Sequence, residues 1–567
     1  MNEAGILHIP DSRYCFAINE NELVIRFRLA KEDRDVKVFL LYGMKYDYQT
    51  KRKEKEIFIC YEDKLFVYFE VKLHLDDTRF AYIFRLEKEN ELYYFSEDGV
   101  TQDYDFSNAF YNFFQMPYIN QADLFPCVPW MKEAVFYQIF VDRFCKGNEQ
   151  KNQSYITMNW GEKPTPTNFA GGDLQGILAK LDYLSDLGIN AIYLSPIFTS
   201  PSNHKYDIID YYTIDEQFGS KKDLKQLIEV AHQKGMRVIL DAVFNHCSYR
   251  SKEFMDVIRK GKESKYYSWF LIQGDFPDIK EQNYESFAAC YYMPKWNTSN
   301  PEVQKHLIQI GLYWVREFDI DGWRLDVSDE VSHQFWRQFR LAIKQQKVDC
   351  VLIGENWHDA YPYLMGDQYD SIMNYAFTKA CLDCFAFNRY SVQDMAEQLN
   401  HILMRNVSQV NQMNLNLLDS HDVHRIFTQV GCSKEKLLAA LALMFMFPGV
   451  PCLYYGTEIC MEGGYDPDSR RTFDWNMEHW DLQIMAKIKE LIALKKEKIV
   501  QEGEVRIFFK GAILVIERKY NDTCLIVELN LSNQEQNLDE DISQSLIENG
   551  VRYHNVLVPY GYRISKR

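Results

Sequence analysis

The sequence predicts an α/β protein: a (β/α)8 TIM barrel between two β-domains, with a subdomain inserted after the third barrel strand. Three observations predict it. Apolar residues alternate with period two near the N-terminus, short apolar strands then alternate with helices, and period two returns near the C-terminus. The expected boundaries are 1–122 for an N-terminal β-sandwich, 123–246 and 301–498 for the barrel, 247–300 for the insertion and 499–567 for a C-terminal β-domain.

The N-terminal segment shows the period of a half-buried antiparallel sheet. Leu23, Ile25, Phe27 and Leu29 fall on one face of one strand, and residues 65–73 and 80–86 repeat the pattern. Several such strands separated by turn signals indicate a β-sandwich. Nothing in this segment resembles a catalytic group, and the pattern leaves a ligand-binding role and an interface role open.

From residue 135 the pattern becomes strand, helix, strand. Residues 135–140 form the first expected strand, Asp173 is expected to cap a helix that stops at Gly188, and a strand follows at 191–194. Ser220 is expected to cap the next helix, Gly235 to end it, and a third strand to follow at 238–240. The Asn300-Pro301 pair predicts the start of the helix before the fourth strand.

The later strands end next to carboxylates. The fourth and fifth expected strands precede Asp326 and Glu355, a sixth covers 371–375, and the last two lie at 415–418 and 452–455. About eight such units suit a closed barrel better than an open sheet. Active sites of barrels lie at the C-terminal strand ends, so side chains at these ends are the candidate functional residues.

Composition excludes several classes of protein. A formal charge of −17 argues against nucleic acid or an anionic membrane as a partner, because both require a basic surface. Thirteen cysteines without paired spacing indicate reduced thiols, and the N-terminus lacks a basic and apolar leader. The apolar run at 437–455 is interrupted by Pro448 and Pro451, which indicates a buried helix and strand. We therefore expect a cytoplasmic protein without a membrane segment.

Three carboxylates at strand ends, Asp326, Glu355 and Asp422, suggest chemistry on sugars. Breaking a glycosidic bond requires one carboxyl group to protonate the leaving oxygen and another to attack or stabilise the sugar. A single Asp at a strand end is more often a cap or an ion-pair partner. Three of them at three strand ends favour a glycoside hydrolase.

The segments around these residues resemble sequence blocks of the α-amylase family of glycoside hydrolases. The matching blocks occur in the family's order and are residues 241–246, 322–326, 354–357, 420–422 and 449–458. Residues 293–297 and 463–471, together with the N-terminal β-sandwich, resemble one branch of that family: the cyclomaltodextrinases, neopullulanases and maltogenic amylases. Trp296 differs, since this branch commonly has leucine there.

The resemblance implies a role for each catalytic candidate. Asp326 would be the nucleophile, Glu355 the acid and base, and Asp422 the group that holds the distorted sugar. Substrate binding would involve Arg324, which would orient the nucleophile, and His246, His421, Asp241, Tyr206, Trp357, Asp466 and Arg470. For the two histidines and Trp357 a core role is the alternative, and for Asp466 and Arg470 bracing of their loop.

The resemblance further implies hydrolysis of α-1,4 bonds in cyclodextrins and maltooligosaccharides, extending to pullulan or starch, with some transglycosylation. The alternatives are a general α-amylase or α-glucosidase of the same family, or an inactive glucan-binding protein. No cofactor is required by this chemistry. Relatives that bind calcium imply a calcium site at Asn148, Asn152 and Asp173. Lys146 stands where an oxygen ligand is expected, so the presence and the absence of calcium both stay open. A homodimer is also implied.

Overall fold

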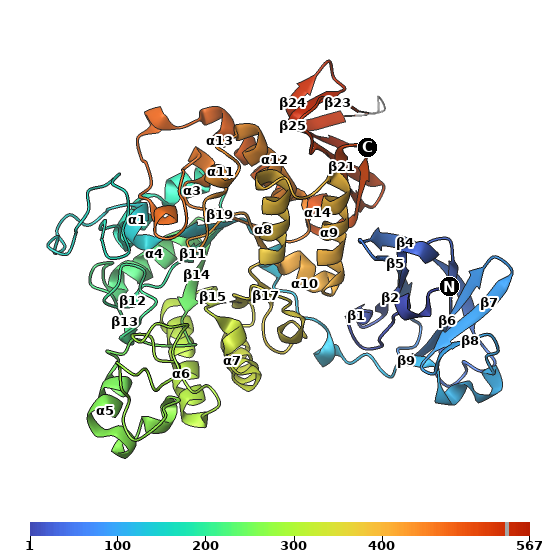
Figure 1. Ribbon diagram of the computed structural model, residues 1–567, viewed down its shortest axis with the longest axis horizontal. Coiled ribbons are helices and arrows are strands. Elements are labelled where there is room, and N and C mark those ends of the chain that lie inside the picture. The colour runs from blue at the N-terminus through green and yellow to red at the C-terminus, as the bar shows by residue number, and fades with distance from the viewer. Residues whose placement is uncertain (539–543) are drawn as a thin grey trace.

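The computed structural model describes residues 1–538 and 544–567. Figure 1 shows the barrel and its helices in the centre, the blue N-terminal domain on one side and the red C-terminal sheet above it. Helix α9 (Val392–Met404) contacts both β4 of the N-terminal domain and β20 of the C-terminal sheet. One helix of the barrel layer therefore joins the three parts.

Residues 1–120, all of which the structure describes, contain nine antiparallel strands in the order β1-β2-β5-β4-β3-β6-β7-β8, with β9 beside β6. The residues predicted to face inward on β2 are fully buried in the core of this domain. The predicted period-two pattern is thus confirmed. The strands are β1 Cys15–Asn19, β2 Glu22–Ala30, β3 Lys37–Met44, β4 Lys53–Glu62, β5 Phe66–His74, β6 Phe80–Lys88, β7 Glu91–Ser96, β8 Gly99–Thr101 and β9 Phe114–Met116.

Eight parallel strands form the barrel between residues 136 and 454, a range described throughout. Their order is β17-β16-β15-β14-β11-β10-β19-β18, and a parallel bridge between Met373 and Leu415 closes the ring. The predicted barrel is confirmed, although the sixth strand is shorter than expected. The strands are β10 Phe136–Ile139, β11 Ala191–Leu194, β14 Arg237–Ala242, β15 Gly322–Leu325, β16 Val351–Gly354, β17 Ser371–Ile372, β18 Leu415–Leu417 and β19 Val450–Tyr454.

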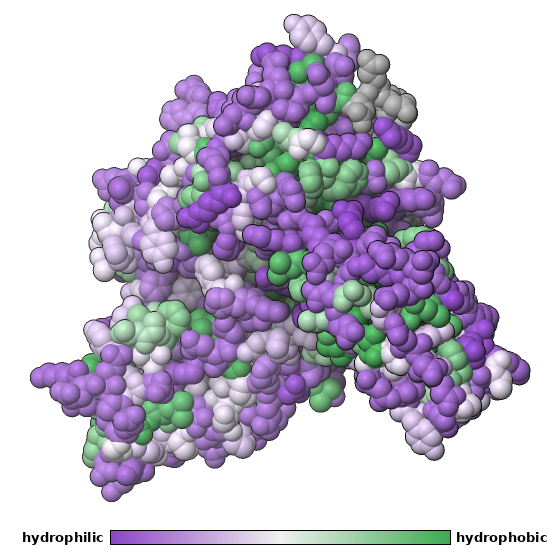
Figure 2. All heavy atoms as spheres, turned by 45° about the vertical axis from the view of Figure 1, so that its right-hand side comes forward, coloured by the Kyte–Doolittle hydropathy of each residue, from purple (hydrophilic) through white to green (hydrophobic). Residues whose placement is uncertain are grey.

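Buried apolar residues fill the barrel and its outer layer. Phe136, Tyr193, Ile239, Ile353 and Leu417 belong to one core cluster supplied mainly by the barrel strands. The surrounding helices bury their apolar faces in a second, larger cluster. On the face that Figure 2 shows, hydrophilic side chains predominate. No helix in the described residues is long and apolar enough to cross a membrane.

The helices begin at the predicted caps, with one difference. Ser220 and Asp223 form a reciprocal capping box, and the Asn300 side chain accepts from the backbone N–H of Glu302. The helix expected from Asp173 to Gly188 is instead two helices, because Lys180 leaves helical geometry with φ −109° and ψ 7°. The helices packed on the barrel are α1 Val141–Phe144, α2 Leu174–Ala179, α3 Leu181–Leu187, α4 Lys221–Gln233, α6 Pro301–Phe318, α7 His333–Gln346, α8 Tyr375–Cys381, α9, α10 Ser408–Met413, α11 Ile426–Gln429, α12 Lys434–Met446, α13 Leu482–Lys495 and α14 Lys498–Glu502.

Two further regions flank the barrel. Residues 247–300 contain helix α5 (Lys252–Lys260) and short turns, and they return to the barrel through a bridge between His246 and Lys295. A small hairpin of β12 (Phe198–Thr199) and β13 (Asp210–Ile214), not foreseen from sequence, lies after β11. The antiparallel C-terminal sheet comprises β20 Glu504–Lys510, β21 Ile513–Tyr520, β22 Thr523–Asn530, β23 Gln536–Asn537, β24 Gln544–Arg552 and β25 Val556–Lys566.

Candidate active site

The barrel brings carboxylates together at the C-terminal ends of three neighbouring strands. Strands β14, β15 and β16 are adjacent, and the register places Asp241 beside Arg324. Asp326 follows β15 by one residue and Glu355 follows β16 by one residue. Because the strands are parallel, all of these side chains emerge at the same rim of the barrel.

Arg324 contacts all three of these carboxylates. Its Nη1 donates to Asp326 Oδ1 at 2.7 Å and to both oxygens of Asp241 at 3.1 Å. Its Nη2 lies 2.9 Å from Glu355 Oε2 in an ion pair. The guanidinium is 1% exposed, so these charge-assisted contacts are shielded from water. One fixed cation therefore holds Asp326 and Glu355 toward the same point.

The oxygens of Asp326 and Glu355 differ in their hydrogen bonds. Asp326 Oδ1 is bonded to Arg324, whereas its buried Oδ2 has no hydrogen-bond partner among the described residues. Glu355 Oε2 accepts from the backbone N–H of Val327 at 2.9 Å, and Trp357 Nε1 lies 3.3 Å from Oε1. Val327 has φ 44°, an unfavourable conformation for a β-branched residue, which aims this N–H at Glu355. A buried, unpaired carboxylate oxygen is expensive unless a ligand uses it.

Burial raises the pKa of Glu355, and the Asp422 carboxylate raises it further, while Arg324 opposes both. Burial likewise raises the pKa of Asp326 and raises that of Asp241 to about 6, again opposed by Arg324. Arg324 Nη1 donates to both aspartates and so favours their ionised forms. Three buried carboxylates face this one cation, so their mutual repulsion favours retention of a proton within the cluster.

Asp422 lies at the open side of the cluster. Its side chain is 28% exposed, its Oδ2 is 3.2 Å from His421 Nε2, and its Oδ1 is 3.4 Å from Arg470 Nη2. Arg470 Nη1 also pairs with Asp466 at 2.9 Å. Asp466 and Arg470 thus brace Asp422 from the loop after β19, and Asp466, whose side chain is 35% exposed, also remains accessible.

The two predicted histidines are neutral and buried. Burial, followed by the charges of Arg470 and Arg324, lowers the pKa of His421, and its Nε2 contacts the hydroxyl of Tyr206 at 2.6 Å. Burial lowers the pKa of His246 to about 3, and its buried Nε2 has no partner among the described residues. His246 can therefore bind a ligand hydroxyl, whereas His421 contacts Tyr206 and Asp422.

Aromatic rings line two sides of this rim. Tyr206 stacks on His421 with ring centroids 5.4 Å apart, and its hydroxyl donates to Asp241 at 3.0 Å. Trp357 is 44% exposed and stacks on Tyr375 with centroids 3.7 Å apart. The exposed ring of Trp357 offers a flat apolar face beside Glu355, of the kind that sugar rings stack on.

Three residues of this site were not singled out from sequence. Tyr193 donates to Asp241 Oδ2 at 2.6 Å from inside β11, where it looked like a core residue. Tyr375 supports Trp357 from the first turn of α8. Lys295 contacts Asn245 and pairs with Glu330 at 3.0 Å, and its position inside the distinctive run 293–297 was the only signal that could have found it.

The residues named for calcium do not fit that cation. The side-chain oxygens of Asn148 and Asn152 accept hydrogen bonds from the backbone N–H groups of Gln150 and Ser154, respectively. Asp173 lies instead against an ammonium group, since Lys151 Nζ is 2.8 Å from its Oδ2 and donates at 2.8 Å to the carbonyls of Gly171 and Gln217. In the described residues no group of three or more His, Cys, Asp or Glu side chains is arranged to hold a metal.

The buried Lys151–Asp173 pair gives a stability prediction. The two side chains are 7% and 1% exposed, and burial lowers the pKa of Lys151 while Asp173 opposes this. The Lys151→Met variant would leave Asp173 charged and without its cation, so we expect a loss of about 3–5 kcal/mol in the free energy of unfolding. Urea denaturation measures this loss. Lys146→Met, a change at an exposed position of the same loop, is the control.

Treatment with a chelator tests whether this loop binds a metal ion. A chelator should leave the melting temperature of the unaltered protein unchanged, because Lys151 already supplies the positive charge. A fall in melting temperature that added calcium reverses would contradict this account.

A parallel barrel with an arginine-bridged carboxylate cluster at its C-terminal rim defines the class of barrel glycoside hydrolases. Comparison with known proteins makes this more specific. A family model described as "Alpha amylase, catalytic domain" matches residues 138–512, and one described as "Alpha amylase, N-terminal ig-like domain" matches residues 1–120. The chain belongs to the α-amylase family.

Relatives resemble the chain over nearly its whole length. It is 42% identical to a cyclomaltodextrinase of Thermoanaerobacter pseudethanolicus, with 94% of each chain covered. It is 38% identical to an intracellular maltogenic amylase of Bacillus subtilis, covering 98% of this chain and 97% of the relative. A solved cyclomaltodextrinase structure superimposes with a TM-score of 0.92 at 33% identity, with 100% of both chains covered.

Proposed function

We propose that this protein is a retaining glycoside hydrolase that cleaves α-1,4-glucosidic bonds in cyclodextrins and maltooligosaccharides, with pullulan and starch as further substrates and transglycosylation as a side reaction. The observation that carries the proposal is the contact of one buried guanidinium with Asp326, Glu355 and Asp241. The relatives named cyclomaltodextrinase and maltogenic amylase support the substrate class.

The geometry suits a double displacement. Asp326 Oδ2 attacks the anomeric carbon while Glu355 gives its proton to the departing glycosidic oxygen, so one C–O bond forms as the other breaks. Glu355 then takes a proton from water, whose oxygen replaces Asp326 on the same carbon. A sugar hydroxyl in place of water gives transglycosylation. Two inversions retain the anomeric configuration.

The remaining groups hold the sugar between these carboxylates. Asp422, braced by Arg470, would accept from hydroxyls of the distorted ring and favour its developing positive charge. The free Nε2 of His246 would bind a further hydroxyl, and Tyr206 and Trp357 would stack on sugar faces on either side.

Substrate preference separates this function from that of a general α-amylase or α-glucosidase. We expect kcat/KM on β-cyclodextrin to exceed that on soluble starch, measured per cleavable bond as reducing ends released. A clear preference for starch would favour a general α-amylase. Release of glucose alone from chain ends would favour an α-glucosidase, and binding of maltooligosaccharides without turnover an inactive glucan-binding protein.

We also propose a homodimer that resides in the cytoplasm. Several large apolar side chains of the N-terminal domain are exposed, among them Tyr46, Phe58 and Tyr111, and a second copy could cover them. All thirteen cysteines are free, as is usual in a reducing compartment, and one relative is named intracellular. Light scattering at micromolar concentration should give twice the chain mass of 67.3 kDa.

A further inference from the structure

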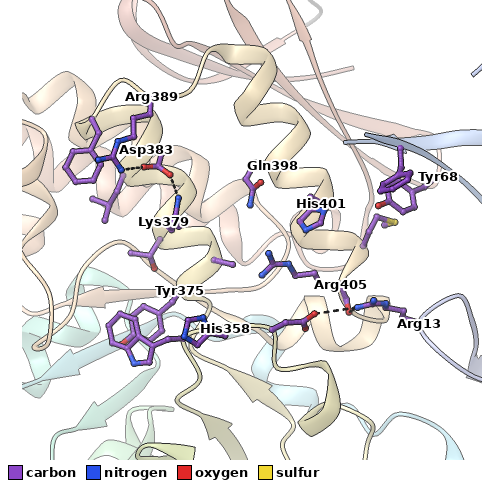
Figure 3. Close-up of a pocket in the computed structure, with 18 of the residues that line it drawn as sticks. Arg13, Tyr68, His358, Tyr375, Lys379, Asp383, Arg389, Gln398, His401 and Arg405 are labelled. Carbon is purple, nitrogen blue, oxygen red and sulfur yellow. Dashed lines mark hydrogen bonds and ion pairs between the residues drawn. The ribbon is translucent and has the colours of Figure 1, made fainter. Parts of the chain in front are cut away.

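A cavity of about 620 Å³ lies between the N-terminal domain and helices α8 and α9. Figure 3 shows residues from both sides of it, with Arg13 and Tyr68 from the N-terminal domain facing Arg405 and His401 of the barrel layer. The walls are joined by fixed contacts. Lys31 pairs with Glu397 of α9 at 2.6 Å, and Asn400 of α9 donates to the carbonyl of Glu62 at 3.0 Å.

One end of the cavity reaches the carboxylate cluster. Trp357 lines it and places its Nε1 3.3 Å from Glu355 Oε1. Val423, the residue after Asp422, lines it as well. Glu355 is the group that protonates the leaving oxygen, so the cavity extends from the side of the cleft that holds the leaving part of the substrate.

The lining offers one exposed stacking face and groups that form hydrogen bonds. Trp357 presents its exposed ring at the near end, whereas Tyr14 and Tyr68, which line the wall from the N-terminal domain, are largely buried. Gln398 in the middle of α9 and Arg405 directly after its end also line the cavity, and neither side chain has a partner among the described residues. An apolar ring face with a few unpaired polar groups suits a chain of sugar rings.

Most of the other charges around the cavity are paired, which favours a neutral ligand. Arg13 lies 3.9 Å from Asp359, Arg389 pairs with Asp383 at 3.0 Å, and Lys379 also contacts Asp383. Arg28 lies over the ring of Phe66 at 3.8 Å. A site for a free anion would instead leave several cations converging on one point.

We propose that this cavity binds the leaving-side arm of longer linear α-glucans, with the N-terminal domain of the same chain as one wall. This inference depends on the proposed function. It assigns the sandwich a direct role in chain-length preference: short substrates would be held by the cleft alone, and longer ones would also contact Arg405 and Gln398. Such contacts strengthen binding equally before and during the reaction, and so they act on KM.

The test compares kcat/KM on maltoheptaose with kcat/KM on maltotriose. Arg405→Ala removes a charged hydrogen-bond donor, and we expect the ratio of the two values to fall about tenfold, through KM for maltoheptaose. Gln398→Trp, which fills the cavity without removing a charge, should lower the ratio in the same way. Arg316→Ala, on the exposed side of α6, is the control and should leave the ratio unchanged.

The outcomes are distinguishable. An unchanged ratio in both cavity variants, with normal turnover of both substrates, would overturn this inference and leave the proposed function standing. Failure of the unaltered protein to cleave either substrate would overturn both. A rise in melting temperature with inorganic phosphate that Arg405→Ala abolishes, without any change in the ratio, would identify an anion site and also overturn the inference.

Discussion

Asp326→Asn should reduce kcat on a maltooligosaccharide by about 10²–10⁴-fold or more. A loss of that size is usual when a catalytic acid or base is removed. The substitution keeps the size and shape of the side chain but removes the negative charge that attacks the anomeric carbon. Arg324 Nη1, which donates to Asp326 at 2.7 Å, keeps its bonds to Asp241. The defect should therefore be chemical, and the fold should persist.

Two measurements separate lost chemistry from lost structure. The melting temperature of Asp326→Asn should stay close to that of the unaltered protein, because the variant removes one of several carboxylates crowded around Arg324. The control is Asp182→Asn, since that side chain is 84% exposed on α3 and lies far in sequence from the site. Activity of Asp326→Asn within tenfold of normal would rule out this residue as the nucleophile.

Glu355→Gln should lower kcat by about 10²–10⁴-fold on maltooligosaccharides, because the leaving sugar oxygen would depart without a proton. The loss in the first step should be much smaller with maltosyl fluoride, since fluoride departs without protonation. Pre-steady-state release of fluoride measures that step. An equal loss on both substrates would show that Glu355 is not the acid.

The same residue should govern the pH profile. Burial and Asp422 raise the pKa of Glu355, and an acid acts only while protonated. Activity is therefore present below this pKa and declines as the pH rises through it. That alkaline limb should be present in kcat/KM for a maltooligosaccharide and absent from kcat/KM for maltosyl fluoride, whose leaving group needs no proton. An alkaline limb that persists would have to come from another group.

Local sequence was sufficient to predict the barrel and the residues at its rim. Each strand is a short apolar run, and a parallel barrel delivers the residue after such a run to one end, so Asp326 and Glu355 could be placed together. The position of Arg324 beside Asp326 could also be predicted, because residues two apart on a strand share a face. The caps at Ser220 and Asn300 are local hydrogen bonds and were found for the same reason.

Features that depend on distant contacts could not be predicted. Lys151 looked like an ordinary loop residue, and only the fold brings Asp173 and the carbonyl of Gln217 to its ammonium group. The stacking of Trp357 on Tyr375 joins the loop after β16 to the first turn of α8. The close approach of Gly176 to the carbonyl of Cys145, where a Cβ would be only 2.0 Å away, likewise depends on the fold.

The proposed reaction requires Arg324 to hold a nucleophile and an acid on opposite sides of one bond, close enough for two successive displacements at the same carbon. In enzymes of that kind the carboxyl groups are about 5–5.5 Å apart, which leaves no room for water to attack first. Proton NMR of the first products released from an α-1,4-linked maltooligosaccharide tests this directly. The α-anomer should form first and then mutarotate, whereas initial formation of the β-anomer would contradict a double displacement at Asp326.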